Sequence, residues 1–305
     1  MKMYLFIITL LTTYCLLLTA AGAEVGQAGQ DLAILKAGLG ARPLGMGGAF
    51  TAVADSADST SWNPAGLGFI EQSEITTSQT RLSSDADHYY LSYVRPLAGG
   101  TLGISWVQIG LGSLVGTSKE VDVNNEVVDL SVFTYFSNAY LISYGKKVNE
   151  LLSFGLTAKY LNQDMQVVGG QASGYSVTPG ILLKLKNNWQ LGARIDELFN
   201  HQQWATGTSE RVPPKVCLGL AYVKSNPGVF ALDVSQTLKS GYGAEGSVGY
   251  EWQREGLAFR TGYGTNGLSA GAGFTSGHTK VDYAFVTQAS LTTSNVHRVS
   301  LSGVW

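Results

Sequence analysis

Residues 152–160 read LSFGLTAKY, and this short stretch shows the pattern that decides the fold. Every second residue from Leu152 to Tyr160 is apolar or aromatic, and the residues between them are Ser153, Gly155, Thr157 and Lys159. Successive side chains of a β-strand point to opposite faces, so the alternation predicts a strand with one apolar face and one small or polar face.

The same alternation recurs in segments 216–222, 281–287 and 297–305. In segment 216–222 the apolar set alternates with Cys217 and small residues, so we expect Cys217 to face inward and to serve packing. The second face throughout is made of Gly, Ser, Thr, Lys and Asp. That composition suits a polar lumen better than the solvated face of a sandwich, which is crowded with charges.

Composition narrows the class of protein. Of the 305 residues only 14% are charged, whereas about 25% is usual. The net charge of −2 leaves no footprint for nucleic acid, so no nucleic-acid partner is expected. No stretch of about 18 apolar residues follows residue 23, which argues against a transmembrane helix. A soluble exported β-protein and a β-barrel in an outer membrane both remain open.

The number and spacing of strands favour the barrel. We expect about fourteen strands between residues 73 and 305, an even number of roughly ten-residue strands, as bacterial outer-membrane barrels have. The longest predicted connections, 110–130, 162–172 and 197–213, all fall on one side, and tight turns fall on the other. The terminal stretch HRVSLSGVW alternates up to Trp305 and resembles the last strand that the barrel-assembly machinery recognises. We expect this strand to pair with the first, because an open edge is costly in lipid.

The N-terminus predicts export. Lys2 precedes an apolar run at 3–18, and Ala21-Gly22-Ala23 supplies the small residues of a cleavage site. We therefore expect residues 1–23 to be a cleaved signal peptide. Cys217 is then the single cysteine of the mature chain, which excludes an internal disulfide.

Catalytic, metal and cofactor sites are not expected. The four histidines are scattered without metal-ligand spacing, and no Gly-x-Ser-x-Gly elbow occurs. The glycines in RPLGMGGAFTAVADSADSTSWNPAGL, residues 42–67, lack the Lys-Ser/Thr and the strand–helix context of a nucleotide loop. We predict a protein that is not an enzyme and has no cofactor.

This glycine-rich stretch resembles the N-terminal signature of PorV/PorQ-like outer-membrane proteins, which are similar to FadL-type long-chain fatty-acid transporters. The likeness rests on ARPLGMGGAFTAVAD at 41–55 and on WNPAGL at 62–67, about 30 residues in all. It implies a fourteen-stranded barrel in the outer membrane of a Gram-negative-type cell, with an N-terminal hatch or plug folded into the lumen. It also implies that Asn63, Pro64 and Ala65 match the Asn-Pro-Ala turn of the family.

The residues themselves agree with a compact plug. Glycine permits close packing and positive φ, and Pro64 favours a turn after Asn63. The apolar residues of 49–54 predict a short helix in the lumen, and Asp55 and Asp58 are expected to pair with lumen cations such as Arg194 or Lys159. The predicted division is 1–23 signal peptide, 24–71 hatch or plug and 72–305 barrel. The residues predicted to form the hatch or to gate a ligand are Gly45, Gly47, Gly48, Phe50, Asn63, Pro64 and Ala65.

Two functions follow from the resemblance. The first is passive transport or binding of a hydrophobic small molecule, with the hatch as gate. The second is an accessory barrel for type IX-like protein secretion, which docks cargo or a translocon. Transport predicts an apolar pocket beside Asn63–Ala65, whereas docking predicts an apolar patch on 110–130 or 197–213. The expected partners are outer-membrane lipid and the barrel-assembly machinery, together with the hydrophobic ligand or the secretion-system proteins. The signature could also serve only plug packing and assembly.

Overall fold

The strands form one antiparallel ring that closes on itself. The computed structural model describes residues 33–36, 38–83, 86–121, 123–124, 127–166, 170–224, 228–265, 267–287 and 295–305, and the predicted signal peptide at 1–23 lies outside them. Strand β1 pairs with β2 on one side and with the C-terminal strand β16 on the other. At the join, the backbone N–H of Ser73 donates to the carbonyl of Trp305, and that of Trp305 donates back. The predicted pairing of the last strand with the first is confirmed, and a two-sheet sandwich is excluded.

Fourteen of the sixteen strands in the described part of the chain make up the ring, as predicted, and β8 and β9 form a hairpin attached to the edge of β6. The strands are β1 (Glu74–Ser83), β2 (Ala86–Leu97), β3 (Gly100–Val121), β4 (Val127–Lys147), β5 (Leu152–Asp164), β6 (Gln171–Lys184), β7 (Trp189–Asp196), β8 (Leu198–Trp204), β9 (Ser209–Glu210), β10 (Lys215–Val223), β11 (Val229–Thr237), β12 (Ala244–Arg254), β13 (Leu257–Gly264), β14 (Gly267–Ser276), β15 (Thr279–Val286) and β16 (Val296–Val304).

Helices are short and lie mostly near the N-terminus. They are α2 (Ala33–Lys36), α3 (Ala41–Gly45), α4 (Ser59–Trp62), and the 3-10 helices η1 (Pro64–Phe69) and η2 (Lys186–Asn188). In the described residues no helix has the length and apolar character needed to cross a membrane.

The predicted alternation is confirmed strand by strand. In β5, Phe154, Leu156 and Tyr160 are exposed on the outer face, while Ser153 and Thr157 are fully buried inside. The burial in β15 and β16 alternates in the same way, with Val299 exposed and Arg298 buried. Large apolar side chains therefore cover the outside of this ring, and small, polar and charged side chains fill its inside.

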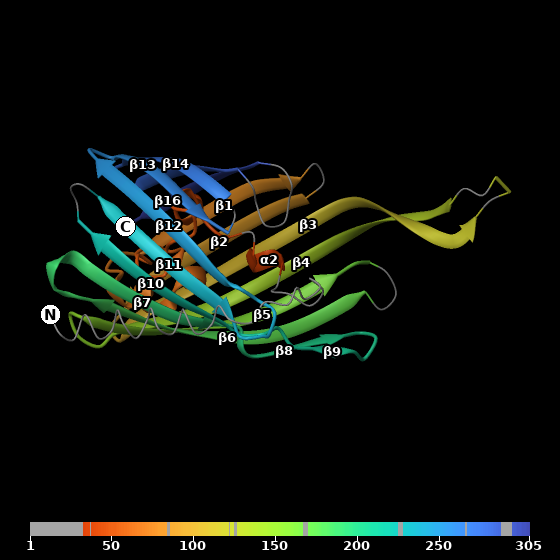
Figure 1. The fold of residues 1–305 in the computed structure, drawn as a ribbon, viewed down its shortest axis with the longest axis horizontal. Helices are drawn as coiled ribbons and strands as arrows, with labels where there is room; N and C mark the ends of the chain where they lie inside the picture. Colours follow the sequence, from red (N-terminus) through yellow and green to blue (C-terminus); the bar gives the residue numbers. More distant parts are fainter. Residues whose placement is uncertain are drawn as a thin grey trace.

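Two predicted connections are wrong because strands continue through them. Residues 110–130 were expected to be a loop, but β3 and β4 extend into this region as a long hairpin that projects beyond the rest of the barrel (Figure 1). The backbone of 197–213 forms β8 and β9 instead of an irregular loop. Glu197 and Phe199 have positive φ, and this break lets the chain leave the direction of β7. The valine-rich sequence of the hairpin (Val115, Val121, Val127 and Val132) has high strand propensity, which explains the first difference.

Candidate functional site

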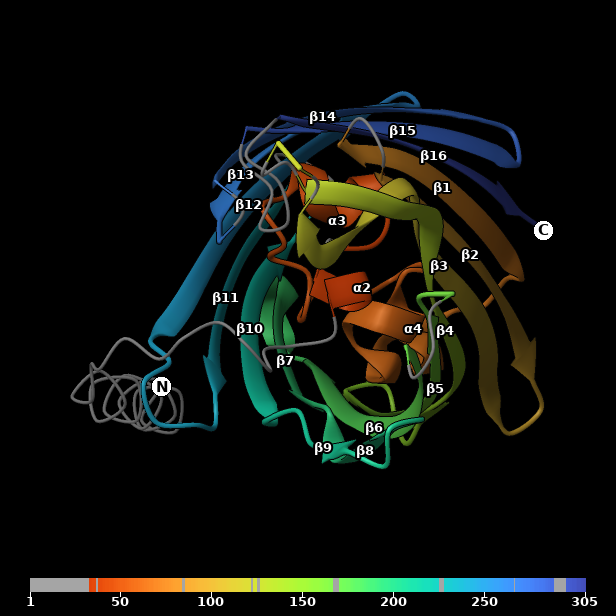
Figure 2. The ribbon, with the colours of Figure 1, turned by 90° about the vertical axis from the view of Figure 1, so that its right-hand side faces the viewer.

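The N-terminal segment, residues 38–70, lies inside the ring of strands. Figure 2 shows α2, α3 and α4 enclosed by the strands when the barrel is viewed along its length. Helix α3 contacts β13–β16, whereas η1 contacts β3–β6. The segment therefore crosses the lumen from one wall to the opposite wall.

A belt of inward-facing glycines on the barrel wall receives this segment. A Cβ added at Gly155 would lie 2.1 Å from the carbonyl carbon of Pro64, and one at Gly192 would lie 2.3 Å from the carbonyl oxygen of Thr51. The other members of the belt, each on a strand that faces the segment, are Gly103, Gly145, Gly180, Gly219, Gly249, Gly262 and Gly271. Several are direct cross-strand partners, such as Gly145 with Gly155 and Gly192 with Gly219. At most of these glycines the backbone of the segment packs directly on the wall, whereas Gly103 and Gly180 receive the side chains of Thr60 and Asn63.

Sequence analysis missed the glycine belt. The signal was present, because one glycine recurs on the small-residue face of nearly every strand from β3 to β14. A glycine inside a strand costs stability unless another backbone approaches it closely. The abundance of glycine was therefore evidence for a segment packed against the wall.

Of the three predicted glycines of the segment, Gly45 and Gly47 lie against strands β13 and β14, and Gly48 lies near Trp62 and Ser247 of β12. Gly45 and Gly271 face each other, and a Cβ added at either would lie 3.3 Å from the Cα of the other. Gly47 and Gly48 have φ of 67° and 82°, values that L side chains rarely adopt. A Cβ at Gly47 would also meet the backbone nitrogen of Tyr263 at 2.6 Å. These glycines allow a tight turn in contact with the wall.

Phe50 belongs to an apolar cluster in which the segment meets β10 and β11. The cluster comprises Met46, Ala49, Phe50, Ala52, Val53, Ala54, Ala221, Val229 and Ala231, with Trp62 packed against it. The predicted helix over 49–54 is wrong. Residues 51–53 form a turn, in which the backbone N–H groups of Val53 and Ala54 donate to the carbonyl of Phe50. The buried carboxylate of Asp233 caps the start of this turn, because it accepts hydrogen bonds from the N–H groups of Phe50 (3.0 Å) and Thr51 (2.9 Å).

The Asn63–Ala65 turn joins two parts of the segment to the wall. The side-chain amide of Asn63 donates to the carbonyls of Thr51 (2.7 Å) and Ile181 (3.2 Å), and its oxygen accepts the N–H of Ala65 (3.1 Å). Pro64 begins η1, where its missing N–H costs nothing. Asn63 and Ala65 are fully buried, Asn63 against Gly180 of β6 and Ala65 against Gly155 of β5. Among the described residues, close packing is therefore found where transport predicted an apolar pocket.

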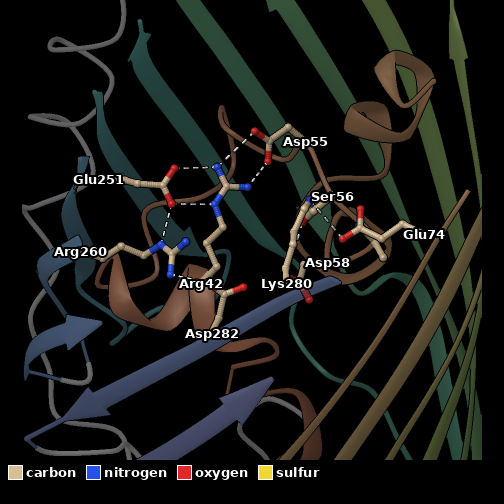
Figure 3. Close-up of polar contacts among 10 residues, drawn as sticks. Arg42, Asp55, Ser56, Asp58, Glu74, Glu251, Arg260, Lys280 and Asp282 are labelled. Atoms are coloured by element: carbon tan, nitrogen blue, oxygen red, sulfur yellow. Dashed lines mark hydrogen bonds and ion pairs between the residues drawn. The ribbon is translucent and has the colours of Figure 1, made fainter. Parts of the chain in front are cut away.

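An ionic network ties α3 to strands β12, β13 and β15 (Figure 3). Arg42 donates to Glu251 through Nε (2.8 Å) and Nη2 (2.9 Å), and it also pairs with Asp55. Arg260 bridges Glu251 and Asp282, at 2.6 Å to each. Burial disfavours charge on Arg42, but Asp55 and Glu251 outweigh burial and raise its pKa well above the ordinary value. Arg42 therefore keeps its charge inside the barrel.

The predicted pairing of Asp55 and Asp58 with Arg194 or Lys159 is wrong. Lys159 pairs with Glu197 at 2.5 Å, and Arg194 pairs with Asp196 at 3.0 Å. Arg194 does reach the segment, but it donates to the carbonyl of Trp62 and to the hydroxyl of Thr51 (3.3 Å). Lys159 and Arg194 are thus paired with acids outside the N-terminal segment. Asp55 pairs with Arg42 instead.

Asp58 is the charged group of the segment that has the least favourable surroundings. Its side chain lies under Gly40 and accepts a long 3.5 Å contact from the hydroxyl of Ser56. Its Oδ1 has no hydrogen-bond partner among the described residues. Burial, followed by the charges of Glu74 and Asp282, raises the pKa of Asp58 to about 7.

A second apolar cluster lines the lumen on the side of the β3–β4 hairpin. Its members are Ile34, Leu39, Leu82, Ala86, Tyr90, Val107, Ile109, Ala139, Leu141, Leu161 and Val296. Most of them are inward-facing residues of β1–β5, and Ile34 of α2 is inserted among them. This cluster was not predicted, because the inner face was expected to consist of Gly, Ser, Thr, Lys and Asp.

An apolar outside and a polar, filled inside define this protein as a transmembrane β-barrel whose lumen is occupied by its own N-terminal segment. A soluble barrel would bury the apolar face and expose the polar one.

No protein-family model and no curated protein sequence matches this chain. Solved structures with the same fold do match. The toluene transporter TodX of Pseudomonas putida is 15% identical, with a TM-score of 0.62 over 90% of this chain and 98% of the other. The toluene transporter TbuX of Ralstonia pickettii is 13% identical, with a TM-score of 0.55 over 88% and 98%. A FadL homologue of Pseudomonas aeruginosa is 12% identical, with a TM-score of 0.54 over 87% and 97%.

These structures confirm the barrel fold that the FadL-type resemblance implied. The first two are toluene transporters and the third is a FadL homologue. None of them bears on the PorV/PorQ part of the resemblance, which stays a prediction.

Proposed function

We propose that this barrel allows a hydrophobic small molecule to cross the outer membrane of a Gram-negative-type cell by passive diffusion, with the N-terminal region 24–71 as its hatch. Residues 72–305 form the barrel, and the predicted gating residues Gly45, Gly47, Gly48, Phe50 and Asn63–Ala65 hold the hatch closed. The fold shared with hydrocarbon transporters supports this proposal.

The observation that carries the proposal is the apolar cluster around Ile34. A lumen used for water or ions needs polar walls, whereas Tyr90, Val107 and Leu141 offer an apolar surface on the inner face of β2–β4. Ile34 occupies this surface, and an apolar ligand that binds there would displace it. Because Leu39 belongs to the same cluster and precedes α3 directly, displacement would reach the hatch through the chain itself.

The gating step is tested by a disulfide between hatch and wall. Gly45 and Gly271 are in direct contact and neither has positive φ, so a Gly45→Cys/Gly271→Cys pair in a Cys217→Ser background places one thiol on the hatch and one on the wall. Because a Cβ at position 271 would lie 2.9 Å from the carbonyl oxygen of Tyr283, the reduced double variant must first match the wild type in uptake. We expect uptake of a fluorescent apolar probe into proteoliposomes to stop when the pair is oxidised and to return after reduction. The two single-cysteine variants are the matched controls. Equal uptake by the oxidised and reduced protein would refute a gate formed by this part of the hatch.

A second candidate function is docking of secreted proteins, and the β3–β4 hairpin favours it. Beyond Leu111 and Phe136 neither strand has a further strand partner in the described chain, and Val115 and Val132 are 53% and 69% exposed. Such edges can add a strand from another polypeptide. Replacing 114–133 by an Asn-Gly turn separates the two functions: probe uptake persists if the barrel is a transporter, and export of cargo is lost if it is a docking barrel.

A further inference from the structure

Four strands end in the same outward-facing pattern, an aromatic residue followed two positions later by a basic one. The pairs are Tyr93 and Arg95 on β2, Tyr144 and Lys146 on β4, Tyr222 and Lys224 at the end of β10, and Trp252 and Arg254 on β12. The aromatic and the basic residue of each pair share the outer face, because side chains two apart in a strand point the same way. We call Arg95, Lys146, Lys224 and Arg254 the basic ring.

The basic ring lies at one end of the barrel. Each of its members comes directly before one of the short connections, on the side opposite the projecting hairpin (Figure 1). Other aromatic side chains reinforce the belt beside it. Trp252 stacks on Phe259, Phe230 packs on Tyr250, and Trp305 stacks on Tyr93.

The ring carries positive charge that the protein itself leaves mostly uncompensated. All four side chains are exposed, and in the described part of the chain only Arg254 has an ion pair, with Glu255. Ion pairs form at both ends of the barrel, as between Lys147 and Glu150 near the short turns and between Arg81 and Asp87 at the opposite end. Arg95, Lys146 and Lys224 are three exposed cations of the ring to which the described residues supply no ion-pair partner.

We propose that the basic ring binds the headgroups of anionic phospholipids at the membrane surface on the short-turn side. Aromatic side chains are enriched at the level of the lipid headgroups. The Lys or Arg two residues closer to the end of the strand can extend its aliphatic stem so that its charge lies at the phosphates. Attraction to an anionic surface adds over several such charges. The ring thereby fixes the depth and the orientation of the barrel. This inference rests on the proposed position of the barrel in an outer membrane, but not on transport.

The test uses the fluorescence of the protein's own tryptophans. Trp189, Trp252 and Trp305 lie near the short turns, so brominated lipids in contact with this end will quench them. The full mature protein is reconstituted in vesicles that contain brominated phosphatidylglycerol or brominated phosphatidylcholine in varied ratio. The dependence of quenching on lipid ratio gives the binding constant of phosphatidylglycerol relative to phosphatidylcholine, and we expect this ratio to be about three. Added salt should reduce it.

Two triple variants remove equal charge from the two ends. Arg95→Gln/Lys146→Gln/Lys224→Gln removes the three ring members that have no ion pair, and it should bring the relative binding constant close to one. Arg81→Gln/Arg211→Gln/Lys239→Gln removes three basic side chains from the far end and should leave the threefold preference unchanged.

The outcomes separate this inference from the proposed function. Equal quenching by both lipids in the wild type, or equal effects of the two triple variants, overturns lipid binding by the ring while transport still stands. No quenching by either lipid would show that the barrel does not insert, which overturns both. Loss of probe uptake with the lipid preference intact would leave the ring in place and remove the transport proposal.

Discussion

Arg42 and Glu251 are joined by two hydrogen bonds of 2.8 and 2.9 Å, although 209 positions separate them in the chain. Arg42 belongs to the N-terminal segment and Glu251 to the barrel wall. Glu251 also accepts from Arg260, so a single carboxylate holds two guanidinium groups. This one buried acid therefore joins α3 of the segment to β12 and β13 of the wall.

Replacing Glu251 by Gln should release the segment. The substitution leaves two buried arginines without their shared counter-charge, which typically costs about 3 kcal/mol. We expect a lower thermal unfolding midpoint in detergent and faster maleimide labelling of Cys217, which is 2% exposed in the closed barrel. Glu255→Gln is the control, because that side chain is 80% exposed and its surface pair contributes less than about 1 kcal/mol. Equal effects of the two substitutions would contradict the closure role of Glu251.

Asp58 should make the closed state less stable as pH rises. Its pKa is about 7 in the folded protein and 3.8 in the exposed chain, so the folded state binds more protons between these values. The contribution of Asp58 to the free energy of unfolding is then highest below about pH 4, declines up to about pH 7 and levels off above it. The full loss is on the order of 4 kcal/mol at about 1.4 kcal/mol per unit.

The Asp58→Asn variant should abolish this decline. The measurement is the thermal unfolding midpoint of wild type and variant in detergent at about pH 4.5 and about pH 8, that is, near the ordinary pKa and above the raised pKa of Asp58. The midpoint should fall between these pH values in the wild type and stay constant in the variant. Asp55→Asn is the comparison, since that carboxylate is half exposed and paired with Arg42. An identical pH slope in the wild type and Asp58→Asn would show that another group titrates.

A methyl group added to the glycine belt should disrupt the Asn63–Ala65 turn. In Gly155→Ala the new Cβ would lie 2.1 Å from the carbonyl carbon of Pro64, and β5 cannot move away without breaking its ladders with β4 and β6. We expect a loss of about 1–3 kcal/mol, as in overpacked cores. Gly246→Ala on β12 is the matched control, because a Cβ there meets nothing within 4 Å. Its unfolding midpoint should stay at or above that of the wild type.

The Asn63 side chain should be required in its amide form. Asn63→Ala removes three hydrogen bonds and leaves buried carbonyls without donors, which costs about 2–3 kcal/mol. Asn63→Asp keeps the acceptor for Ala65 but sets a carboxylate against the carbonyls of Thr51 and Ile181. The Asp variant should therefore be the less stable of the two at pH 8 and recover at low pH, when measured by thermal unfolding.

The barrel could be predicted because its information is local. The alternation of residues along a single strand, such as 152–160, indicates which face contacts lipid, and it can be read without knowing which strands are its neighbours in the sheet. The strand count and the closure by the strand that ends at Trp305 followed from the same pattern. The long β3–β4 hairpin was not predicted because both strands continue past Leu111 and Phe136, where their pairing with β2 and β5 ends.

The contacts of the N-terminal segment could not be predicted in the same way. Its sequence indicated close packing, but the partners of Arg42 and Asp58 lie on strands more than 15 residues away, and most lie more than 190 away. Which acid meets which base depends on the register of fourteen strands and on where the segment crosses the lumen. The periodicity of the sequence predicts neither the register of the strands nor the path of the segment through the lumen.

The sequence by itself determined that this protein is a barrel with an apolar outer face, because each strand must satisfy that requirement alone. Only the tertiary structure decided what fills the lumen and what holds it there. The glycine belt, the Arg42–Glu251 pair and the buried Asp58 exist only when the ring is closed. Closure brings distant strands around one short segment and excludes the water that would otherwise solvate its charges.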